Sequence, residues 1–238
     1  MRSEAVRLFQ TLPHPCGYFA ERTAQNLVID PASPRLPQIY GEALRYGYRR
    51  AGNHVYRPRC GACRACIACR VPVERFVPDR SQRRCRARNA DLERIVAAPG
   101  YSDERFALYR TYLDARHRDG GMDDPHPDDF SRFLYTGWSD TRFVELRERG
   151  RLLAVAVTDF AEDGLSAVYT FFAPDAPASG LGTFAILSQI ELARERGLPY
   201  VYLGFWIAGH PKMDYKARFR PLEILSEGRW REWVRSGS

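Results

Sequence analysis

Four of the six cysteines lie in one short segment, each separated from the next by two residues: Cys60-Gly-Ala-Cys63-Arg-Ala-Cys66-Ile-Ala-Cys69. In a chain without a secretory signal, this spacing indicates metal binding or redox chemistry before structural disulfides. Zinc usually takes two separated pairs of thiolates, whereas three close thiolates with a remote fourth fit an iron–sulfur cluster. We therefore predict an iron–sulfur cluster, with zinc, a redox pair or reduced thiols as alternatives. The predicted ligands are Cys16, Cys60, Cys63 and Cys66, with Cys69 as an alternative ligand.

The two lysines of the chain, Lys212 and Lys216, lie only four residues apart. Every other residue among the 36 basic ones is an arginine. Lysine is a compact charge on a flexible stem and arginine is a planar fork, so a site that needs the former resists replacement by the latter. We therefore interpret Lys212, Lys216 and the intervening Tyr215 as catalytic candidates, with chance clustering as the alternative.

The net charge of +7 is distributed unevenly. Residues 1–100 contain 18 arginines and 8 acidic residues, whereas residues 101–238 contain 18 basic and 21 acidic residues. A basic region beside a mildly acidic one indicates a polyanion partner, and an ordinary solvated surface is the alternative. Around Tyr48, Arg49 and Arg50, arginines alternate with aromatic side chains, a composition suited to RNA phosphates and bases.

The composition excludes several classes of protein. Apolar residues make up 45% and aromatic residues 13% of the chain, which excludes disordered and collagen-like proteins. No run approaches the roughly 18 consecutive apolar residues of a membrane helix, and the first residues lack the apolar core of a signal peptide. We therefore expect a cytoplasmic protein with no membrane partner.

The hydrophobic patterns predict an α+β fold. In the first part, the predicted strands are 4–10, 24–30, 47–57 and 70–76, and the predicted helices are 37–46 and a basic helix over 81–97. In the second part, the predicted helices are 103–118, 128–136 and a third that ends near Arg196, and the predicted strands are 142–148, 151–160, 165–173, 200–206, 221–226 and 229–234. Three strands in a meander, then a helix, then a strand is the order found in GNAT acyltransferases.

A glycine-rich turn with Gly180 and Gly182 begins the last predicted helix. The backbone N–H groups of such a turn can bind an anion. Members of the GNAT fold that use CoA carry the pattern Q/R-x-x-G-x-G/A there. The first position is Pro177 in this chain, so the pattern is incomplete and we expect no CoA.

Motifs spread over nearly the whole chain resemble those of the arginyltransferase family of aminoacyl-tRNA–protein transferases, above all its bacterial branch. The matching segments include Cys16-Gly-Tyr18, Gly47-Tyr-Arg-Arg50, His54-Val-Tyr-Arg-Pro58, the cysteine loop, Gly204-Phe-Trp-Ile207 and Lys212-Met-Asp-Tyr-Lys216. Phe19 replaces a second cysteine of the eukaryotic branch, and Ala65-Cys66 replaces its adjacent cysteine pair. Both departures favour leucine over arginine as the transferred residue, and they leave the ligand set of the cluster-binding branch incomplete.

The resemblance implies transfer of leucine from leucyl-tRNA to the α-amine of proteins that begin with Asp or Glu, within the bacterial N-degron pathway. It implies a basic cysteine-loop domain over residues 1–100 that binds tRNA and acceptor, and a GNAT-like transfer domain over 101–238. The alternatives are an arginyl-tRNA–protein transferase, a CoA-dependent N-acetyltransferase, and a non-enzymatic RNA-binding protein with a metal cluster.

The chemistry of this transfer assigns candidate roles to particular side chains. The donor ester is already activated, so neither ATP nor another cofactor is required. The acceptor amine has a pKa of about 7.7–8.0, and its neighbouring carboxylate requires a cation. Candidates for that cation are Arg49, Arg50, Lys212 and Lys216, while Tyr215 is a candidate proton relay and Asp159 a candidate partner of the amine. A leucyl pocket is predicted from Tyr169, Phe171 and Phe172, for which core packing is the alternative.

Overall fold

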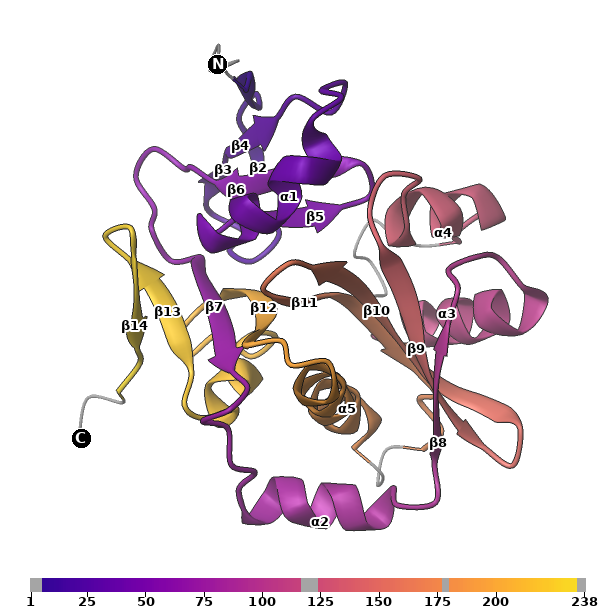
Figure 1. Cartoon of the computed structure of the whole chain (residues 1–238). Coiled ribbons are helices and arrows are strands. Elements are labelled where there is room, and N and C mark those ends of the chain that lie inside the picture. The colour runs from indigo at the N-terminus through magenta and orange to yellow at the C-terminus, as the bar shows by residue number, and fades with distance from the viewer. Residues whose placement is uncertain (1–5, 117–123, 177–179, 235–238) are drawn as a thin grey trace.

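An eight-stranded sheet forms the centre of the structure (Figure 1). The computed structural model describes residues 6–116, 124–176 and 180–234. The strands lie in the order β14-β13-β7-β12-β11-β10-β9-β8. Their bounds are β7 Ile67–Pro72, β8 Glu93–Ala97, β9 Thr141–Glu148, β10 Arg151–Ala161, β11 Gly164–Phe172, β12 Tyr200–Trp206, β13 Glu223–Ser226 and β14 Arg229–Glu232.

Strands β11 and β12 are the one parallel pair in this sheet among the described residues, with Leu165 opposite Val201. A parallel pair requires a crossover, which is supplied by α5 (Leu181–Glu195). Strands β9, β10 and β11 form an antiparallel meander, with tight turns at Arg149-Gly150 and at Glu162-Asp163. The predicted order of meander, helix and strand is confirmed, as is the mixed α and β content.

Helices cover both faces of the large sheet. Helix α5 lies within the curve of the sheet, and α3 (Asp103–Arg116) and α4 (Pro127–Leu134) cover the other face (Figure 1). Strand β10 shows the alternation that this requires, because Ala154 and Ala156 pack on the α5 side while its valines pack towards α3 and α4. No helix in the described part of the chain is long and apolar enough to cross a bilayer.

A smaller sheet precedes the large one in the chain. Its strands lie in the order β1-β4-β6-β5, beside a short β2–β3 pair. The bounds are β1 Leu8–Gln10, β2 His14–Pro15, β3 Thr23–Ala24, β4 Asn26–Ile29, β5 Arg49–Ala51 and β6 His54–Pro58. Helix α1 (Leu36–Arg45) packs on this sheet, and its core includes Tyr202 from β12 of the large sheet. The two sheets therefore share a hydrophobic core.

The predicted basic helix over 81–97 is wrong in its second half. Helix α2 runs from Arg80 to Arg88, and β8 follows it. The helix stops at Asn89, whose side-chain Nδ2 donates to the Cys85 carbonyl oxygen at 2.8 Å. The following Ile95 and Val96 pair with β9, because β-branched side chains fit a sheet that a distant segment provides.

The predicted division at residue 100 runs through the large sheet. Strand β7 pairs with β12 and β8 pairs with β9, so the sheet takes strands from both sides of that position. The cysteine loop joins two strands, but these lie in different sheets, β6 in the small one and β7 in the large one, so the loop does not lie within a separate small N-terminal unit.

Candidate functional site

Strands β11 and β12 separate towards their carboxyl ends, and a bulge lies where they part. Their parallel register runs from Gly164 opposite Tyr200 to Ser166 opposite Tyr202, although both strands continue beyond it. On its other edge β11 pairs with β10, and a register shift leaves Val168 as an extra residue. Because a bulge interrupts the ladder, it leaves backbone groups unpaired that a side chain can bind.

The guanidinium of Arg49 lies across this separation. Its Nη2 donates to the Val168 carbonyl oxygen at 3.1 Å, and its Cζ lies 5.8 Å from the centroid of the Phe205 ring. Gly204 leaves room for it, since a Cβ there would lie 3.3 Å from Nη1 of Arg49. Among the described residues Arg49 forms no ion pair, so its charge is available to a carboxylate from outside the chain.

Lys216 lies on the short 3-10 helix η2 (Asp214–Arg218) and is only 4% exposed. Its Nζ donates a hydrogen bond to the carbonyl oxygen of Phe205, the residue beside Arg49. The pKa of this amine is lowered to about 8, mainly by burial; the Cys69 thiol opposes this shift and the nearby Arg49 charge adds to it. Lys216 is therefore a buried amine that gains and loses its proton near neutral pH.

The structure gives the two lysines different environments. Lys212 is exposed, whereas Lys216 is buried. Tyr215, between them, is 45% exposed, and its ring centroid lies 5.9 Å from Nζ of Lys216. Of the predicted catalytic group, Lys216 and Tyr215 thus lie near Arg49, and Lys212 faces solvent beside them.

His210 forms hydrogen bonds both to Lys212 and to Tyr18, which lies in the turn after β2. Its Nδ1 accepts from the backbone N–H of Lys212 at 3.2 Å, and its Nε2 donates to the carbonyl oxygen of Tyr18 at 3.1 Å. This pattern requires the tautomer with the proton on Nε2. The rings of Tyr18 and Phe19 pack edge-on against the imidazole, each 5.6 Å away. Sequence reasoning missed His210, and its only signal was its place two residues before Lys212.

Arg50 and Asp159, which were predicted to act on the acceptor separately, are paired with each other. Both side chains are fully buried, with Nε of Arg50 2.6 Å from Oδ2 of Asp159. Tyr40 Oη and Thr141 Oγ1 also donate to this carboxylate, at 2.8 and 2.7 Å. The guanidinium further binds the carbonyl oxygens of Gly52 and Leu134. This cluster joins the two sheets, and both charges are satisfied within it.

The aromatic residues predicted to form a leucyl pocket lie in two different places. Phe171 is fully buried in the core under α3 and α4, and Tyr169 packs against Phe133 with a ring distance of 5.2 Å. Phe172 is half-buried against Tyr112, at 4.9 Å. A Cβ on Gly182 would lie 3.1 Å from the Phe172 ring, so this ring lies at the start of α5. Tyr169 also contacts Tyr112, at a ring distance of 6.3 Å, so of the three residues only Phe171 lies wholly in the core, and Phe172 lies at the end of β11.

Two further predicted positions lie beside these elements. Gly180 precedes α5 with φ +69, a left-handed conformation that favours glycine. Pro177, at the incomplete CoA pattern, lies outside the described residues. Tyr48 is half-buried, and the Arg57 guanidinium lies 5.0 Å from its ring centroid.

Four of the predicted thiol ligands are grouped around Cys66. Burial raises the pKa of Cys66 to about 11, and the neighbouring thiols of Cys16, Cys60 and Cys63 raise it as well. The pKa of Cys63 is lowered instead, by the backbone N–H of Ala65 and by Arg22, whose Nη1 lies 3.3 Å from its sulfur. All of these cysteines are free thiols.

Cys69, the alternative ligand, is buried on β7 beside Lys216, and burial raises its pKa to about 11. It therefore faces the lysine and Arg49 rather than the other four thiols. Those four are soft donors of the kind that iron–sulfur clusters and zinc require. Within the described residues, however, no three metal-binding side chains converge closely enough to hold an ion. The donor type thus fits a cluster or zinc, while the described residues show no arrangement that already surrounds an ion.

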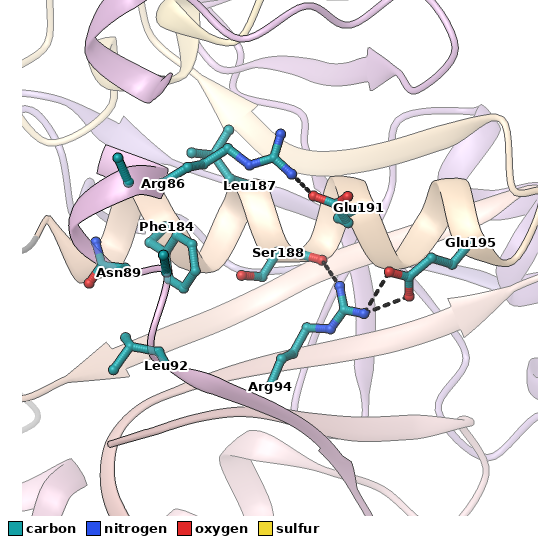
Figure 2. Close-up of a pocket in the computed structure, with 11 residues that line it drawn as sticks. Arg86, Asn89, Leu92, Arg94, Phe184, Leu187, Ser188, Glu191 and Glu195 are labelled. Atoms are coloured by element: carbon teal, nitrogen blue, oxygen red, sulfur yellow. Dashed lines mark hydrogen bonds and ion pairs between the residues drawn. The ribbon is translucent and has the colours of Figure 1, made fainter. Parts of the chain in front are cut away.

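A cavity of about 560 Å³ lies between α2, β8 and α5 (Figure 2). Arg86 pairs with Glu191 across it, and Nη2 of Arg94 contacts both carboxylate oxygens of Glu195 at 2.7 and 2.6 Å. Apolar side chains, including Phe184, form the rest of the wall. None of the predicted site residues lines this cavity, so it is separate from the Arg49 site.

The chain matches two family models. The model described as the N terminus of arginine-tRNA-protein transferase matches residues 14–84, and the one described as its C terminus matches residues 104–226. Among solved structures, the C-terminal DUF2156 domain of an Agrobacterium fabrum protein aligns with a TM-score of 0.47 and 19% identity, over 74% of this chain and 53% of that chain.

Curated relatives match over almost the full length. A protein of Stenotrophomonas maltophilia (strain K279a) named aspartate/glutamate leucyltransferase is 58% identical, over 98% of this chain and 95% of its own length. Proteins of the same name from Xanthomonas campestris pv. campestris (strain B100) and Xylella fastidiosa (strain 9a5c) are 55% and 53% identical. Each covers 95% of this chain, and the matches extend over 92% and 91% of the relatives.

Proposed function

Because the chain belongs to the arginine-tRNA-protein transferase family, as its motifs predicted, we propose that it transfers leucine from leucyl-tRNA to the α-amine of proteins beginning with Asp or Glu. The names of relatives 53–58% identical support leucine as the transferred residue. Phe19 and Ala65, which replace cysteines of the eukaryotic branch, support the same choice. The product would enter the N-degron pathway in the cytoplasm, the compartment that supplies charged tRNA.

In this proposal residues 101–238 form a GNAT-like transfer unit, and residues 1–100 contribute to binding of tRNA and acceptor. The meander of β9 to β11, the crossover helix α5 and the bulge at Val168 support the GNAT-like assignment. Strands β7 and β8 of the first part extend the same sheet, and Arg49 reaches the bulge from the small sheet. The site is therefore built from both parts of the chain.

The observation that carries the proposal is the position of Arg49 across the separation of β11 and β12, without an ion pair to any described residue. An acceptor that begins with Asp or Glu brings a carboxylate close to the reacting amine, and Arg49 supplies a cation in a fixed position. A charge-assisted hydrogen bond of this kind contributes about 1.5–3 kcal/mol, which corresponds to roughly ten- to a hundredfold preference for acidic over neutral termini.

The reaction forms a C–N bond to the acceptor amine and breaks the ester C–O bond to the terminal ribose. The amine loses a proton and the ribose oxygen gains one, so the site needs a short path for that proton. Tyr215 is exposed and adjacent to the Lys216 amine, and it is our candidate for the relay. Lys216, with a pKa of about 8, is a second candidate to take up or release a proton near neutral pH. Positioning of donor and acceptor supplies much of the remaining rate enhancement.

Transfer itself requires no cofactor, because the ester is the activated form of the amino acid. We further propose that Cys16, Cys60, Cys63 and Cys66 are the ligands of an iron–sulfur cluster, or less favourably of zinc. The soft thiolate donors and the x2 spacing of Cys60, Cys63 and Cys66 support this proposal. A visible absorption band after anaerobic purification, lost in the Cys66→Ser variant, is expected; a colourless protein without bound iron would contradict it.

The decisive experiment offers separately labelled leucyl-tRNA, arginyl-tRNA and acetyl-CoA to the purified protein. The acceptors are matched peptides that begin with Asp, Glu or Ala. We expect label from leucyl-tRNA alone, on the Asp and Glu peptides. Label from arginyl-tRNA would favour arginyl transfer, and label from acetyl-CoA alone would favour an N-acetyltransferase. Tight binding of tRNA without any transfer would favour a non-enzymatic RNA-binding protein.

A further inference from the structure

Helix α2 carries four arginines on one exposed face, which we call the arginine ridge: Arg80, Arg83, Arg84 and Arg88. Their spacing of three, four and eight residues from the first places them on one side of a helix with 3.6 residues per turn. On the opposite side, Gln82 and Cys85 of the helix and the following Asn89 are buried, so packing determines which side of α2 faces the solvent.

The charges of the arginine ridge are not neutralised within the described residues. None of its four side chains forms an ion pair there, and Arg83 donates only to the carbonyl oxygen of Pro78. Arg86, on the flank of the same helix, instead pairs with Glu191 of α5. Like charges three and four residues apart repel one another and destabilise a helix. A polyanion bound along the ridge would remove that repulsion.

The ridge is rigidly placed because α2 is held at both ends. At its start, the Asp79 side chain accepts from the backbone N–H of Gln82 at 2.7 Å, which caps the helix. Further along, Nε2 of Gln82 donates to the carbonyl oxygen of Arg218, the last residue of η2, at 3.1 Å. Near its other end, the Cys85 thiol donates to the carbonyl oxygen of Gly180 at 3.5 Å.

These anchors place the ridge between two parts of the proposed active site. One end lies next to η2, which carries Lys216, and the other end lies at the start of α5, where Nη2 of Arg88 is 3.8 Å from the Cβ position of Gly180. Figure 1 shows α2 along the lower edge of the molecule, beneath α5. A long anion on this edge would therefore have one end beside the opening between β11 and β12.

We propose that the arginine ridge binds the phosphate backbone of the double-helical acceptor arm of the tRNA, so that the aminoacylated 3′ end reaches the opening between β11 and β12. This rests on the proposed function. Double-stranded RNA is bound mainly through its shape and its phosphates. Helix α2 extends about 12 Å between Arg80 and Arg88, and a row of four guanidinium groups over that length matches closely spaced phosphates.

The test compares two fourfold variants with equal net charge. The ridge variant carries Arg→Gln at positions 80, 83, 84 and 88. The control variant carries Arg→Gln at positions 7, 110, 149 and 229, which are also exposed and form no ion pair among the described residues. Glutamine is a good helix former, so α2 keeps its intrinsic preference for a helix. Circular dichroism and a thermal melt of each protein verify that it is folded, and the single variant Arg84→Gln provides a milder test.

Binding is measured by fluorescence anisotropy against an uncharged RNA minihelix that consists of the acceptor arm and its 3′ end. For the ridge variant we expect the dissociation constant to rise by about tenfold or more, and the salt dependence of binding (log K against log [salt]) to flatten by about 3. For Arg84→Gln the salt dependence should flatten by roughly 1. In transfer assays, the KM for leucyl-tRNA should rise in the ridge variant while kcat at saturating tRNA stays as in the control.

If the ridge and control variants bind the minihelix equally, the ridge proposal is overturned while leucyl transfer by the native protein still stands. If the native protein binds no tRNA and transfers nothing, both proposals fall. If vesicles of anionic lipid or an acidic peptide bind the ridge in preference to the minihelix, the assignment to RNA is wrong. If only the ridge variant loses minihelix binding, the ridge proposal is supported. This holds even if the native protein transfers an amino acid other than leucine.

Discussion

Arg49 and Arg50 are neighbours on β5, yet they belong to two regions with opposite properties. Arg50 points to a buried cluster in which Asp159, Tyr40 and Thr141 satisfy every charge. Arg49 points the other way, to a bulge carbonyl and an aromatic ring, and has no ion-pair partner in the described part of the chain. Successive side chains on a strand alternate between faces, so one step along the chain separates the two regions.

The comparison distinguishes a buried charge that holds the fold together from one that is available to a substrate. Burial alone does not make the distinction, because Lys216 is almost as buried as Arg50. What differs is the partner: the Arg50 cluster contains its own carboxylate, while the hydrogen bonds of Arg49 and Lys216 to other described residues go to backbone carbonyl oxygens. We therefore expect changes in the Arg50 cluster to affect stability, and changes around Arg49 to affect transfer.

The largest expected effect is on stability, from Asp159→Asn. This change removes the charge that compensates Arg50 in a fully buried position, so the free energy of unfolding should fall by about 3–5 kcal/mol. Urea unfolding measures it. The matched control is Asp175→Asn, which breaks the exposed pair with Arg151 and should cost about 0–1 kcal/mol. Equal effects of the two variants would mean that the Arg50 cluster does not hold the sheets together.

The next largest effect is a pH dependence of stability that comes from Lys216. Its pKa is about 8 in the folded chain and higher in the unfolded chain, so between these values the unfolded chain holds the proton and the folded chain does not. Stability should therefore rise with pH above about 8, by about 3 kcal/mol in total and by roughly 2 kcal/mol by pH 9.5. The Lys216→Met variant should lack this rise, while Lys212→Met should keep it. A rise that survives in Lys216→Met would place its origin elsewhere.

A smaller effect, this time on selectivity, is expected from Arg49→Met. Loss of the cation should reduce kcat/KM for peptides that begin with Asp or Glu by roughly ten- to a hundredfold, which corresponds to about 1.5–3 kcal/mol. Peptides that begin with Ala should be affected much less. Steady-state kinetics with leucyl-tRNA measure both, with Arg110→Met as a control for the loss of one exposed charge. An unchanged ratio of Asp to Ala peptides would remove Arg49 from acceptor recognition.

The smallest effect is expected from Gly204→Ala. The glycine has φ +76, and an added Cβ would lie 3.3 Å from the Arg49 guanidinium. The left-handed backbone conformation should lower the free energy of unfolding by about 1–2 kcal/mol. The displaced Arg49 guanidinium should bind acceptors that begin with Asp or Glu more weakly, with little effect on Ala acceptors. Gly228→Ala is a suitable control, because it has φ +73 but no neighbour within 4 Å. If both variants lose stability but neither loses preference for acidic acceptors, the position of Arg49 does not depend on Gly204.

The sequence predicted those elements whose patterns are local. The meander of β9 to β11, α5 and β12 follow from apolar runs between glycine turns, and the boundaries differ from the prediction by one or two residues. Strand β8 was missed because Ile95 and Val96 follow a helical basic run, and their strand conformation depends on pairing with a segment about 50 residues later.

The candidate site was also predicted only in part, because residue type is visible in the sequence and the packing around each side chain is not. Residue type identified Lys216 and the Tyr-Arg-Arg run as candidates, but it could not separate Arg49 from Arg50, since their difference arises from which sheet packs on each face of β5. It also placed Asp159 at the reaction, whereas the carboxylate belongs to the cluster with Arg50. His210 carried almost no sequence signal, because its role depends on the Tyr18 carbonyl, nearly 200 residues earlier in the chain.

The measurement that tests the central claim most directly is tandem mass spectrometry of an Asp-initiated peptide after incubation with the native protein and leucyl-tRNA. The account predicts a gain of one leucine, attached through a peptide bond to the α-amine of Asp, and no product from the same peptide with an acetylated N-terminus. Leucine attached to a lysine side chain, or no incorporation while the tRNA remains charged, would contradict the account.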